Sequence, residues 1–299
     1  MKSQNPNQAN MRCRPRCSAQ FDTRNRKCSA CGFIPPQTDD HPAPAPRPGE
    51  EGAYFSPDAY PELAALEAEN FWFRVRNHLI VWALTRYFPR MRRCLEIGCG
   101  TGFVLGGIAE AFPEAELMGT DIFSAGLAYA ARRVSGAELH QMDARYIPYR
   151  KEFDVIGAFD VLERIKEDEA VLREMFAALR AGGGIAVTVP QHTWLWSRQD
   201  AYACHVRRYQ VGELREKALR AGFHVVFETS FVSLLLPIMF VSRMFQRDHR
   251  SDINPTDELR LPVAINTVFE NIMRVERRII RLGVRFPLGG SRFLIARRP

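Results

Sequence analysis

The segment LEIGCGTG, residues 95–102, carries three glycines at alternate positions directly behind a short apolar run. A glycine-rich turn after a strand lets the backbone approach a nucleotide closely, because glycine has no Cβ. Phe103 stands where the dinucleotide fingerprint G-x-G-x-x-G requires its third glycine, so the segment departs from that motif. Glu96 adds an anion that a pyrophosphate would not tolerate. The segment therefore indicates a nucleotide-like ligand with positive charge and disfavours an NAD-dependent oxidoreductase.

Further acidic residues follow the next apolar runs at positions suited to an adenosine. Asp121 ends the run AELMGTD, where an acid can accept hydrogen bonds from both ribose hydroxyls. Asp143, in QMDA, is placed to meet the adenine amino group. Asp160 and Glu163 follow the fourth run, where they would border the reacting atoms. S-adenosylmethionine combines an adenosine, an amino acid and a sulfonium cation, and it fits this pattern of acids.

The elements that must position these acids alternate between strands and helices from residue 92 onward. Strands are expected at residues 94–98, 115–121, 137–144, 153–163 and 184–190, with helices after the first, second and fourth. This alternation predicts an α/β fold with a doubly wound, mostly parallel sheet. Ligands of such sheets bind beyond the carboxyl ends of the strands, which is where the acids lie.

Over residues 92–223 the sequence resembles the class I S-adenosylmethionine-dependent methyltransferases of the type 11 group, on the motifs LEIGCGTG, GTD, MDA and DVLE. The resemblance implies a seven-stranded sheet that ends in an antiparallel hairpin, residues 223–232 and 291–299, with an insert at 233–288. Arg164 is a departure, because relatives often carry a histidine there. The cofactor contacts that the resemblance implies are Glu96, Gly98, Cys99, Gly100, Gly102, Asp121, Ile122, Asp143, Ala144 and Asp160.

The methyl acceptor is expected to meet the segment QHTWLWSRQDAYACHVRRYQ, residues 191–210. Methyl transfer needs a base only if the acceptor must lose a proton, and His205 is the first candidate for that base, followed by His192 and Tyr209. A purely structural role for these side chains is equally consistent with the sequence. The predicted substrate-binding residues are Trp196, Asp200, Arg207 and Arg208, of which the arginines suit an anionic group.

Similar LWS…D…H-x-RRY stretches occur in relatives that methylate quinones, polyprenyl compounds and surface glycans. By analogy, the sequence predicts O-methylation of a small hydrophobic, quinone-like, glycan or lipid-linked acceptor. No N-P-P-Y element is visible, so methylation of DNA or protein amide nitrogens is not expected.

The N-terminal part of the chain carries a cysteine pattern of its own. Cys13, Cys17, Cys28 and Cys31 have the spacing C-x3-C-x10-C-x2-C, which can place four thiolates around a structural Zn²⁺ ion. The alternative is four unconnected thiols in a basic arm. We expect a zinc-ribbon-like module at residues 1–34, a proline-rich linker at 35–55, and the methyltransferase domain at 91–299.

A helical cap is expected between linker and domain, at residues 56–90, with Ser56 as its N-cap. Its segment FWFRVRN is either a lid over the ligand or part of the core. The expected apolar face of the cap consists of Phe71, Leu79, Trp82, Ala83 and Tyr87.

Charge is concentrated toward the C-terminus, where the residues from Arg243 onward include twelve arginines and six acids within a net charge of +7. The run FVSLLLPIMFV, residues 231–241, is too short to span a bilayer, and no signal peptide is visible, so a cytosolic protein is expected. Residues 261–283 predict a basic amphipathic helix that either lies in a membrane interface or caps the domain. Its apolar side consists of Ile265, Val268, Phe269, Ile272 and Ile279.

Two alternatives to a small-molecule methyltransferase stay open. A zinc module beside this fold also resembles the guanine methyltransferases of large ribosomal RNA, and the aromatic, basic stretch could stack a flipped base. The fold could also serve as a non-catalytic scaffold.

Overall fold

The computed structural model describes residues 10–12, 20–22, 32, 34, 36–44, 60–246 and 260–299. Two short antiparallel hairpins come first: β1 (Asn10–Arg12) with β2 (Gln20–Asp22), and β3 (Gln37–Thr38) with β4 (His41–Pro42). Outside the described residues lie Ser56 and the four predicted zinc ligands, Cys13, Cys17, Cys28 and Cys31, so the zinc site stays a prediction. Within the described ranges, no group of three or more His, Cys, Asp or Glu side chains could hold a metal ion.

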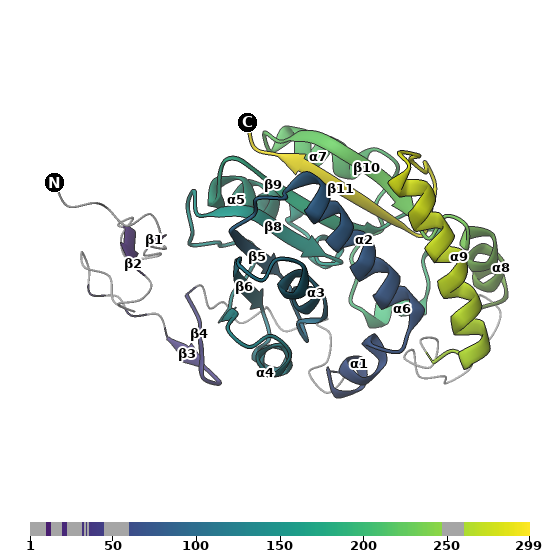
Figure 1. The fold of residues 1–299 in the computed structure, drawn as a ribbon, viewed down its shortest axis with the longest axis horizontal. Coiled ribbons are helices and arrows are strands. Elements are labelled where there is room, and N and C mark those ends of the chain that lie inside the picture. The colour runs from purple at the N-terminus through teal and green to yellow at the C-terminus, as the bar shows by residue number, and fades with distance from the viewer. Residues whose placement is uncertain are drawn as a thin grey trace.

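A seven-stranded sheet with the order β10-β11-β9-β8-β5-β6-β7 forms the centre of the molecule (Figure 1). The five strands from β5 to β9 pair in parallel, whereas β11 lies antiparallel between β9 and β10. The expected doubly wound, mostly parallel sheet with a C-terminal antiparallel hairpin is confirmed. The strands are β5 (Arg93–Ile97), β6 (Glu116–Asp121), β7 (Glu138–Gln141), β8 (Phe153–Phe159), β9 (Leu179–Pro190), β10 (His224–Phe231) and β11 (Ser291–Arg297).

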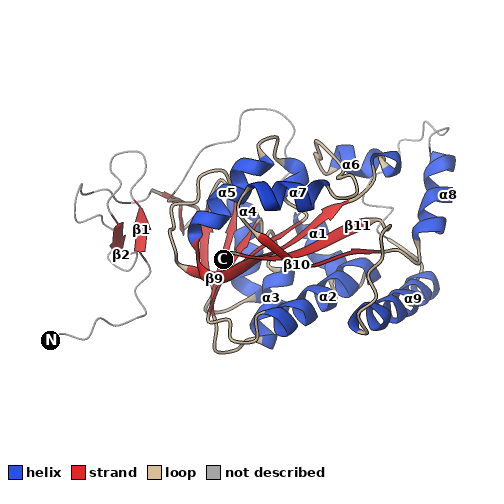
Figure 2. Ribbon diagram, turned by 90° about the horizontal axis from the view of Figure 1, so that it is seen from above, coloured by secondary structure: helices blue, strands red, loops and turns tan. Residues whose placement is uncertain are grey.

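Successive side chains of a strand point to opposite faces of the sheet, and in β5 all of them are buried, so helices cover both faces. In β5, Cys94 and Leu95 are both fully buried but belong to different core clusters. The cluster of Leu95 includes α5 (Asp168–Ala178) and α7 (Glu213–Arg220). The cluster of Cys94 includes α2 (Phe71–Tyr87), α3 (Phe103–Ala111), α4 (Ser124–Arg133) and α9 (Val263–Arg281). Figure 2 shows the sheet between α5 and α7 on one side and α2, α3 and α9 on the other.

The remaining helical elements lie around the carboxyl ends of the parallel strands. They are α1 (Tyr60–Glu67), η3 (Leu162–Arg164), η4 (Thr193–Leu195), α6 (Arg198–Tyr202) and α8 (Leu236–Gln246). None of the helices in the described part of the chain is long and apolar enough to cross a membrane.

The helix α2 has two roles along its length. Leu79 and Ala83 are buried against the sheet as expected, while Trp82 and Tyr87 are half-buried and pack on Phe227 of β10. Asn70 caps its N-terminus by accepting a hydrogen bond from the backbone N–H of Trp72. The C-terminal half of α2 is therefore core, and the first turns are left to contact other elements.

The insert between β10 and β11 folds into α8 and α9. α9 packs on α2 through an edge-to-face contact of Phe269 with Phe71 and through an ion pair of Glu270 with Arg74. Ile265 and Val268, which belong to the apolar side expected from the sequence, stay exposed instead. α9 thus caps the domain with a face centred on Met273 and Ile280, which is rotated about the helix axis from the expected face.

Glu276 connects the two helices of the insert. Its side chain is fully buried, and Oε2 accepts hydrogen bonds from the backbone N–H groups of Ser233 and Leu234, both at 2.7 Å. Burial raises the pKa of Glu276, and the backbone N–H donors lower it. The carboxyl thereby fixes the turn from which α8 starts.

We expect Glu276→Ala to lower the free energy of unfolding by about 1–3 kcal/mol, because two buried N–H groups lose their acceptor. Glu276→Gln should lose less, since its amide oxygen can still accept. Urea unfolding of both variants measures the difference. Glu62→Ala, which removes the half-exposed partner of the exposed Arg260, is the control and should change stability by at most about 1 kcal/mol. Equal losses for the alanine and glutamine variants of Glu276 would contradict this role.

Candidate active site

A cavity of about 1130 Å³ lies beyond the carboxyl ends of the parallel strands. The turns after β5, β6, β7 and β8 form one half of its wall, and α2, α6, the segment after α6 and α8 form the other. Pockets for one small ligand usually have volumes of about 300–1000 Å³. The cavity is therefore large enough for two ligands placed end to end.

The glycine turn after β5 depends on two positions that no other residue could fill without strain. Gly98 has a φ of +66°, and a Cβ there would lie 2.5 Å from a methyl carbon of Val161. Gly102 has a φ of +77°, and a Cβ there would lie 2.9 Å from the Cα of Ala130 in α4. Gly98 therefore lets the turn pass close to η3, and Gly102 lets α3 start directly against α4. Gly102 does not itself line the cavity.

Asp121 holds this turn from the end of β6. Its Oδ2 accepts a hydrogen bond from the N–H of Gly100, and its Oδ1 accepts one from the N–H of Phe123, each at 2.9 Å. Burial raises the pKa of Asp121, and these donors lower it. Asp121, the residue predicted to bind the ribose, lines the cavity beside Ile122.

α1 belongs to the expected helical cap and covers the glycine turn, a contact that the sequence did not predict. The Tyr60 phenol forms a hydrogen bond with Asp121, and burial together with that negative charge raises the pKa of Tyr60. Glu67 is buried at the other end of α1, where it accepts hydrogen bonds from the Thr101 hydroxyl at 2.5 Å and from Arg133 at 2.8 Å. α1 is thus attached at both ends to the elements that form this half of the cavity.

Glu96 is a buried carboxyl on the floor of the cavity. Its side chain is 2% exposed, and its Oε2 has no hydrogen-bond partner among the described residues. Burial raises the pKa of Glu96 well above its usual range, although the nearby Arg76 lowers it. A ligand with a positively charged group would supply the missing partner, and this fits the cation that the sequence pattern indicates.

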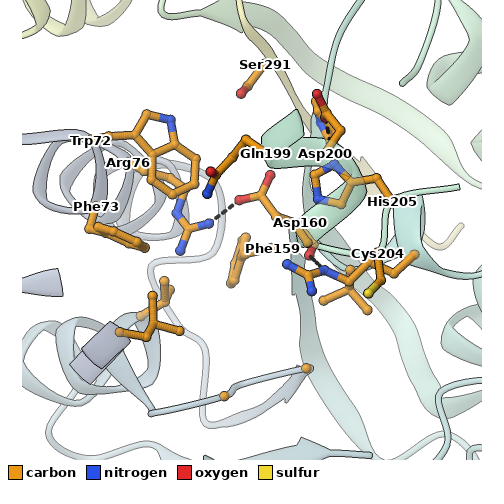
Figure 3. Close-up of a pocket in the computed structure, with 18 of the residues that line it drawn as sticks. Trp72, Phe73, Arg76, Phe159, Asp160, Gln199, Asp200, Cys204, His205 and Ser291 are labelled. Carbon is orange, nitrogen blue, oxygen red and sulfur yellow. Dashed lines mark hydrogen bonds and ion pairs between the residues drawn. The ribbon is translucent and has the colours of Figure 1, made fainter. Parts of the chain in front are cut away.

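Two more acids complete the half of the cavity next to the strand ends. Asp143 is buried beside Ala144 and receives the guanidinium of Arg145 at 2.8 Å. Asp160 has a φ of +59°, an uncommon conformation for aspartate, and pairs with Arg76 from α2. Figure 3 shows this ion pair in the middle of the cavity. It separates the half formed by the strand ends from the half formed by residues 199–208.

His205 and Asp200 form a hydrogen-bonded pair in that second half (Figure 3). Nδ1 of His205 lies 2.8 Å from Oδ1 of Asp200, which also accepts from Nε of Arg208 at 2.8 Å. Burial raises the pKa of Asp200, but the bonds from His205 and Arg208 outweigh it and hold the value at about 2. Because an ionised carboxylate only accepts, Nδ1 carries the proton of a neutral His205 and Nε2 is left as a basic nitrogen.

The pKa of His205 itself is lowered, since burial outweighs the effect of Asp200. The ring is therefore neutral at pH 7 and can accept a proton. Nε2 lies 3.6 Å from Oε1 of Glu163, another buried carboxyl. Three of the residues predicted for the acceptor side, His205, Asp200 and Arg208, line the cavity.

The other residues predicted for the acceptor side do not line the cavity. Tyr209 is fully buried and donates to Asp168 at 2.5 Å, and Arg207 pairs with the same carboxylate at 2.6 Å. His192 is buried and stacks on Trp194, and the exposed Trp196 is not part of the wall. The prediction of Tyr209 and Arg207 as site residues is wrong, because Asp168 on α5 holds both side chains as structural partners.

Several residues that line the cavity were missed or left open by sequence reasoning. Trp72, Phe73 and Arg76 come from the first turns of α2, and the guanidinium of Arg76 lies 4.4 Å from the ring centre of Trp72. Within the segment FWFRVRN, Trp72, Phe73 and Arg76 line the cavity, Val75 belongs to the core, and Phe71 does both. Gln199, Cys204 and Ser291 complete this part of the wall.

Glu163 allows a pH-dependent test of the site. It is 0% exposed, neither of its carboxyl oxygens has a hydrogen-bond partner in the described part of the chain, and burial with the nearby Asp160 raises its pKa to about 8. A raised pKa in the folded protein stabilises it fully below the unfolded value of 4.5, and this stability is lost as the pH rises through 8.

Glu163→Gln removes the titration, so we expect the melting temperature of the variant to rise relative to the parent protein between pH 5 and pH 8.5. Thermal unfolding at several pH values measures this difference. Glu110→Gln, at an exposed position, controls for the change in net charge and should give a constant difference. A constant difference for Glu163→Gln as well would show that Glu163 does not titrate in this range.

Comparisons with known proteins agree with this geometry. Residues 95–185 match the model of a methyltransferase domain family. A protein of Mycolicibacterium smegmatis named a probable S-adenosylmethionine-dependent methyltransferase is 28% identical over 54% of this chain and 63% of its own length. The trans-aconitate 2-methyltransferase of Variovorax paradoxus is 33% identical over 35% of this chain and 40% of its own length. The chain thus spans less than two thirds of either relative.

Among solved structures, phosphoethanolamine N-methyltransferase 2 of Haemonchus contortus in complex with S-adenosyl-L-methionine is similar in fold, with a TM-score of 0.50 and 20% identity. The similarity covers 75% of this chain and 52% of that one. Taken with the sheet order, the glycine turn and the acids at the strand ends, these matches show that residues 95–185 form a methyltransferase domain and that the chain has the class I methyltransferase fold.

Proposed function

We propose that this protein transfers the methyl group of S-adenosylmethionine to a hydroxyl oxygen of an acceptor held between α2, residues 199–208 and α8. The observation that carries the proposal is the His205–Asp200 pair, because it places a neutral imidazole in the same cavity as the glycine turn. An acceptor such as an amine or a thiolate would not require this base.

The half of the cavity formed by the strand ends would hold the cofactor. Bound there, S-adenosylmethionine supplies a methyl group that is already activated by its positive sulfur. Glu96 would face the ammonium group of the amino acid portion, Asp121 would accept from the ribose hydroxyls, and Asp143 with Ala144 would border the adenine. The unpartnered Oε2 of Glu96 supports this assignment.

His205 would take the hydroxyl proton of the acceptor at Nε2 as the acceptor oxygen bonds to the methyl carbon and the bond from that carbon to sulfur breaks, with neutral sulfur in S-adenosylhomocysteine as the leaving group. Asp200 would stabilise the resulting imidazolium through Nδ1–H, and Arg208 would keep Asp200 ionised and in place. Trp72 and Phe73 would keep water from the reacting atoms. The chain thus supplies position, a dry site and a proton acceptor.

The alternatives raised by the sequence differ in what now supports them. The relatives named as methyltransferases support an enzyme over a non-catalytic scaffold. The ribosomal RNA methyltransferase depends on the cysteine module, which lies outside the described residues, and the geometry adds nothing in its favour.

Ligand binding can test the assignment of Glu96 separately from catalysis. We expect Glu96→Gln to weaken binding of S-adenosylhomocysteine roughly 10- to 100-fold, because the amide can still accept a hydrogen bond but no longer carries the negative charge that pairs with the ammonium group of the ligand. Binding of 5′-methylthioadenosine, which lacks the amino acid portion, should be unchanged. Asp121→Asn should weaken both ligands. Calorimetric titration measures all of these affinities, and equal losses of both ligands in Glu96→Gln would contradict the assignment.

The role of His205 is tested by Gln substitution, with His192 as its matched control. We expect His205→Gln to lower kcat by about 10²–10⁴-fold and to remove the acid limb of the pH–rate profile. In the parent protein this limb should lie below pH 6.5, because the pKa of His205 is lowered. His192→Gln should keep both kcat and profile, since His192 does not line the cavity. A full-rate His205→Gln enzyme would exclude the base.

The acceptor can be sought with S-adenosylmethionine labelled on its methyl group. Purified protein is added to a cell extract, which is then separated into lipid, RNA, protein and small-molecule fractions, with Asp121→Ala as the blank. Label in the lipid or small-molecule fraction is expected. Label in RNA would instead support the ribosomal RNA alternative, and no label above the blank would contradict the proposed function.

A further inference from the structure

α8 presents apolar side chains on both of its sides. Leu235, which precedes it, Ile238, Met239 and Ser242 follow the helical spacing of three and four residues, and all of them line the cavity. On the other side, Phe240 is 48% exposed and Val241 is 50% exposed. Apolar side chains on two sides of a helix are normally covered by protein or lipid. In this molecule one side of α8 lines the cavity, and the other is half-exposed within the described part of the chain.

Ile238 connects the two sides. It lines the cavity and is also 49% exposed, so it lies at the mouth of the cavity. The ring of Trp194, from η4, packs edge-to-face on Phe240 at a centroid distance of 5.6 Å and is itself 41% exposed. We call the four exposed side chains Trp194, Ile238, Phe240 and Val241 the α8 patch. Figures 1 and 2 show α8 beside α9 at the end of the molecule away from β1 and β2.

The cavity behind the patch continues as an apolar wall. Met239 of α8 and Phe269 of α9 line it, together with Leu235 and Leu261, which lie just before these two helices. This wall lies on the acceptor side, which the strand-end acids do not reach. An acceptor that fills this region needs a hydrocarbon portion, because the wall offers it few polar partners.

The insert also carries a cluster of positively charged side chains. On α9, Arg274, Arg278 and Arg281 are exposed, and Arg277 lies among them. Burial and these neighbouring positive charges lower the pKa of Arg277. Apolar side chains, with tryptophan among them, together with clustered arginines match the chemistry of an anionic bilayer surface.

We infer that the α8 patch docks this protein on an anionic lipid surface, and that the acceptor is an amphiphile whose hydrocarbon portion enters past Ile238 and lies between α8 and α9. The part about the acceptor rests on the proposed function, whereas the docking does not.

Sedimentation with lipid vesicles tests the docking. Vesicles of phosphatidylcholine containing phosphatidylglycerol should bind the protein, and vesicles of phosphatidylcholine alone should bind it at least tenfold less. The double variant Phe240→Gln/Val241→Gln should lose at least tenfold in binding. The control Val211→Gln/Leu219→Gln removes two apolar side chains of similar exposure on and before α7 and should bind like the parent protein. Unchanged affinity for S-adenosylhomocysteine shows that both variants are folded.

The acceptor part is tested with a total lipid extract and methyl-labelled S-adenosylmethionine. Presented in the anionic vesicles, the extract should be labelled by the parent protein and at least tenfold less by the α8 double variant. Presented in detergent, it should be labelled equally by both. In the fractionated cell extract described above, label confined to water-soluble compounds would overturn the amphiphile as acceptor and leave the proposed function standing.

Three other results would overturn the docking itself: absence of binding to either vesicle, equal binding of the parent protein and the α8 variant, or a dimer in solution that the α8 variant dissociates. Vesicle binding through α8 with no label in any fraction would overturn the proposed function, and the acceptor with it, while the docking stands.

Discussion

The hydrogen bonds that Asp121 accepts from the backbone N–H groups of Gly100 and Phe123 are the constraint on which the whole site depends. The bond from Gly100 joins the turn after β5 to the end of β6, and the bond from Phe123 fixes the turn after β6 itself. The two strands are paired neighbours, so both turns arise at one edge of the sheet. Without this acceptor the N–H groups of Gly100 and Phe123 would have no protein partner there, and the glycine turn would lose the contact that fixes its path. A single carboxylate therefore shapes the turn and remains directed at the cavity.

The charges around the cavity are compensated unevenly. Asp160 and Asp200 each have an arginine within hydrogen-bond distance, and those ion pairs position the side chains that surround the acceptor half. Glu96 has a buried oxygen with no such partner in the described ranges. Since a buried carboxylate is stable only with compensation, Glu96 favours a cation at its end of the cavity, whereas the paired acids at the other end do not require one.

Sequence reasoning found the fold and the cofactor half because both depend on local order along the chain. Each acid lies at or directly after the end of a strand in the sequence, so Glu96, Asp121 and Asp143 could be placed at the edge of the sheet from the sequence. The acceptor half is built from segments distant in sequence, and there it succeeded only in part. His205 and Arg208 line the cavity, whereas Tyr209, adjacent in sequence, turns away to Asp168 on α5. Nothing in the spacing of α2 or α8 could show that Arg76 or Ile238 would meet the same cavity.

The phenol of Tyr60 and the ribose of the proposed cofactor would need the same acceptor. Tyr60 is hydrogen-bonded to Asp121, and Glu67 attaches the same helix to Thr101 and Arg133. If Asp121 binds the ribose as proposed, the cofactor has to share or displace this contact. Its apparent affinity would then be the intrinsic affinity multiplied by the fraction of molecules in which Asp121 is uncovered.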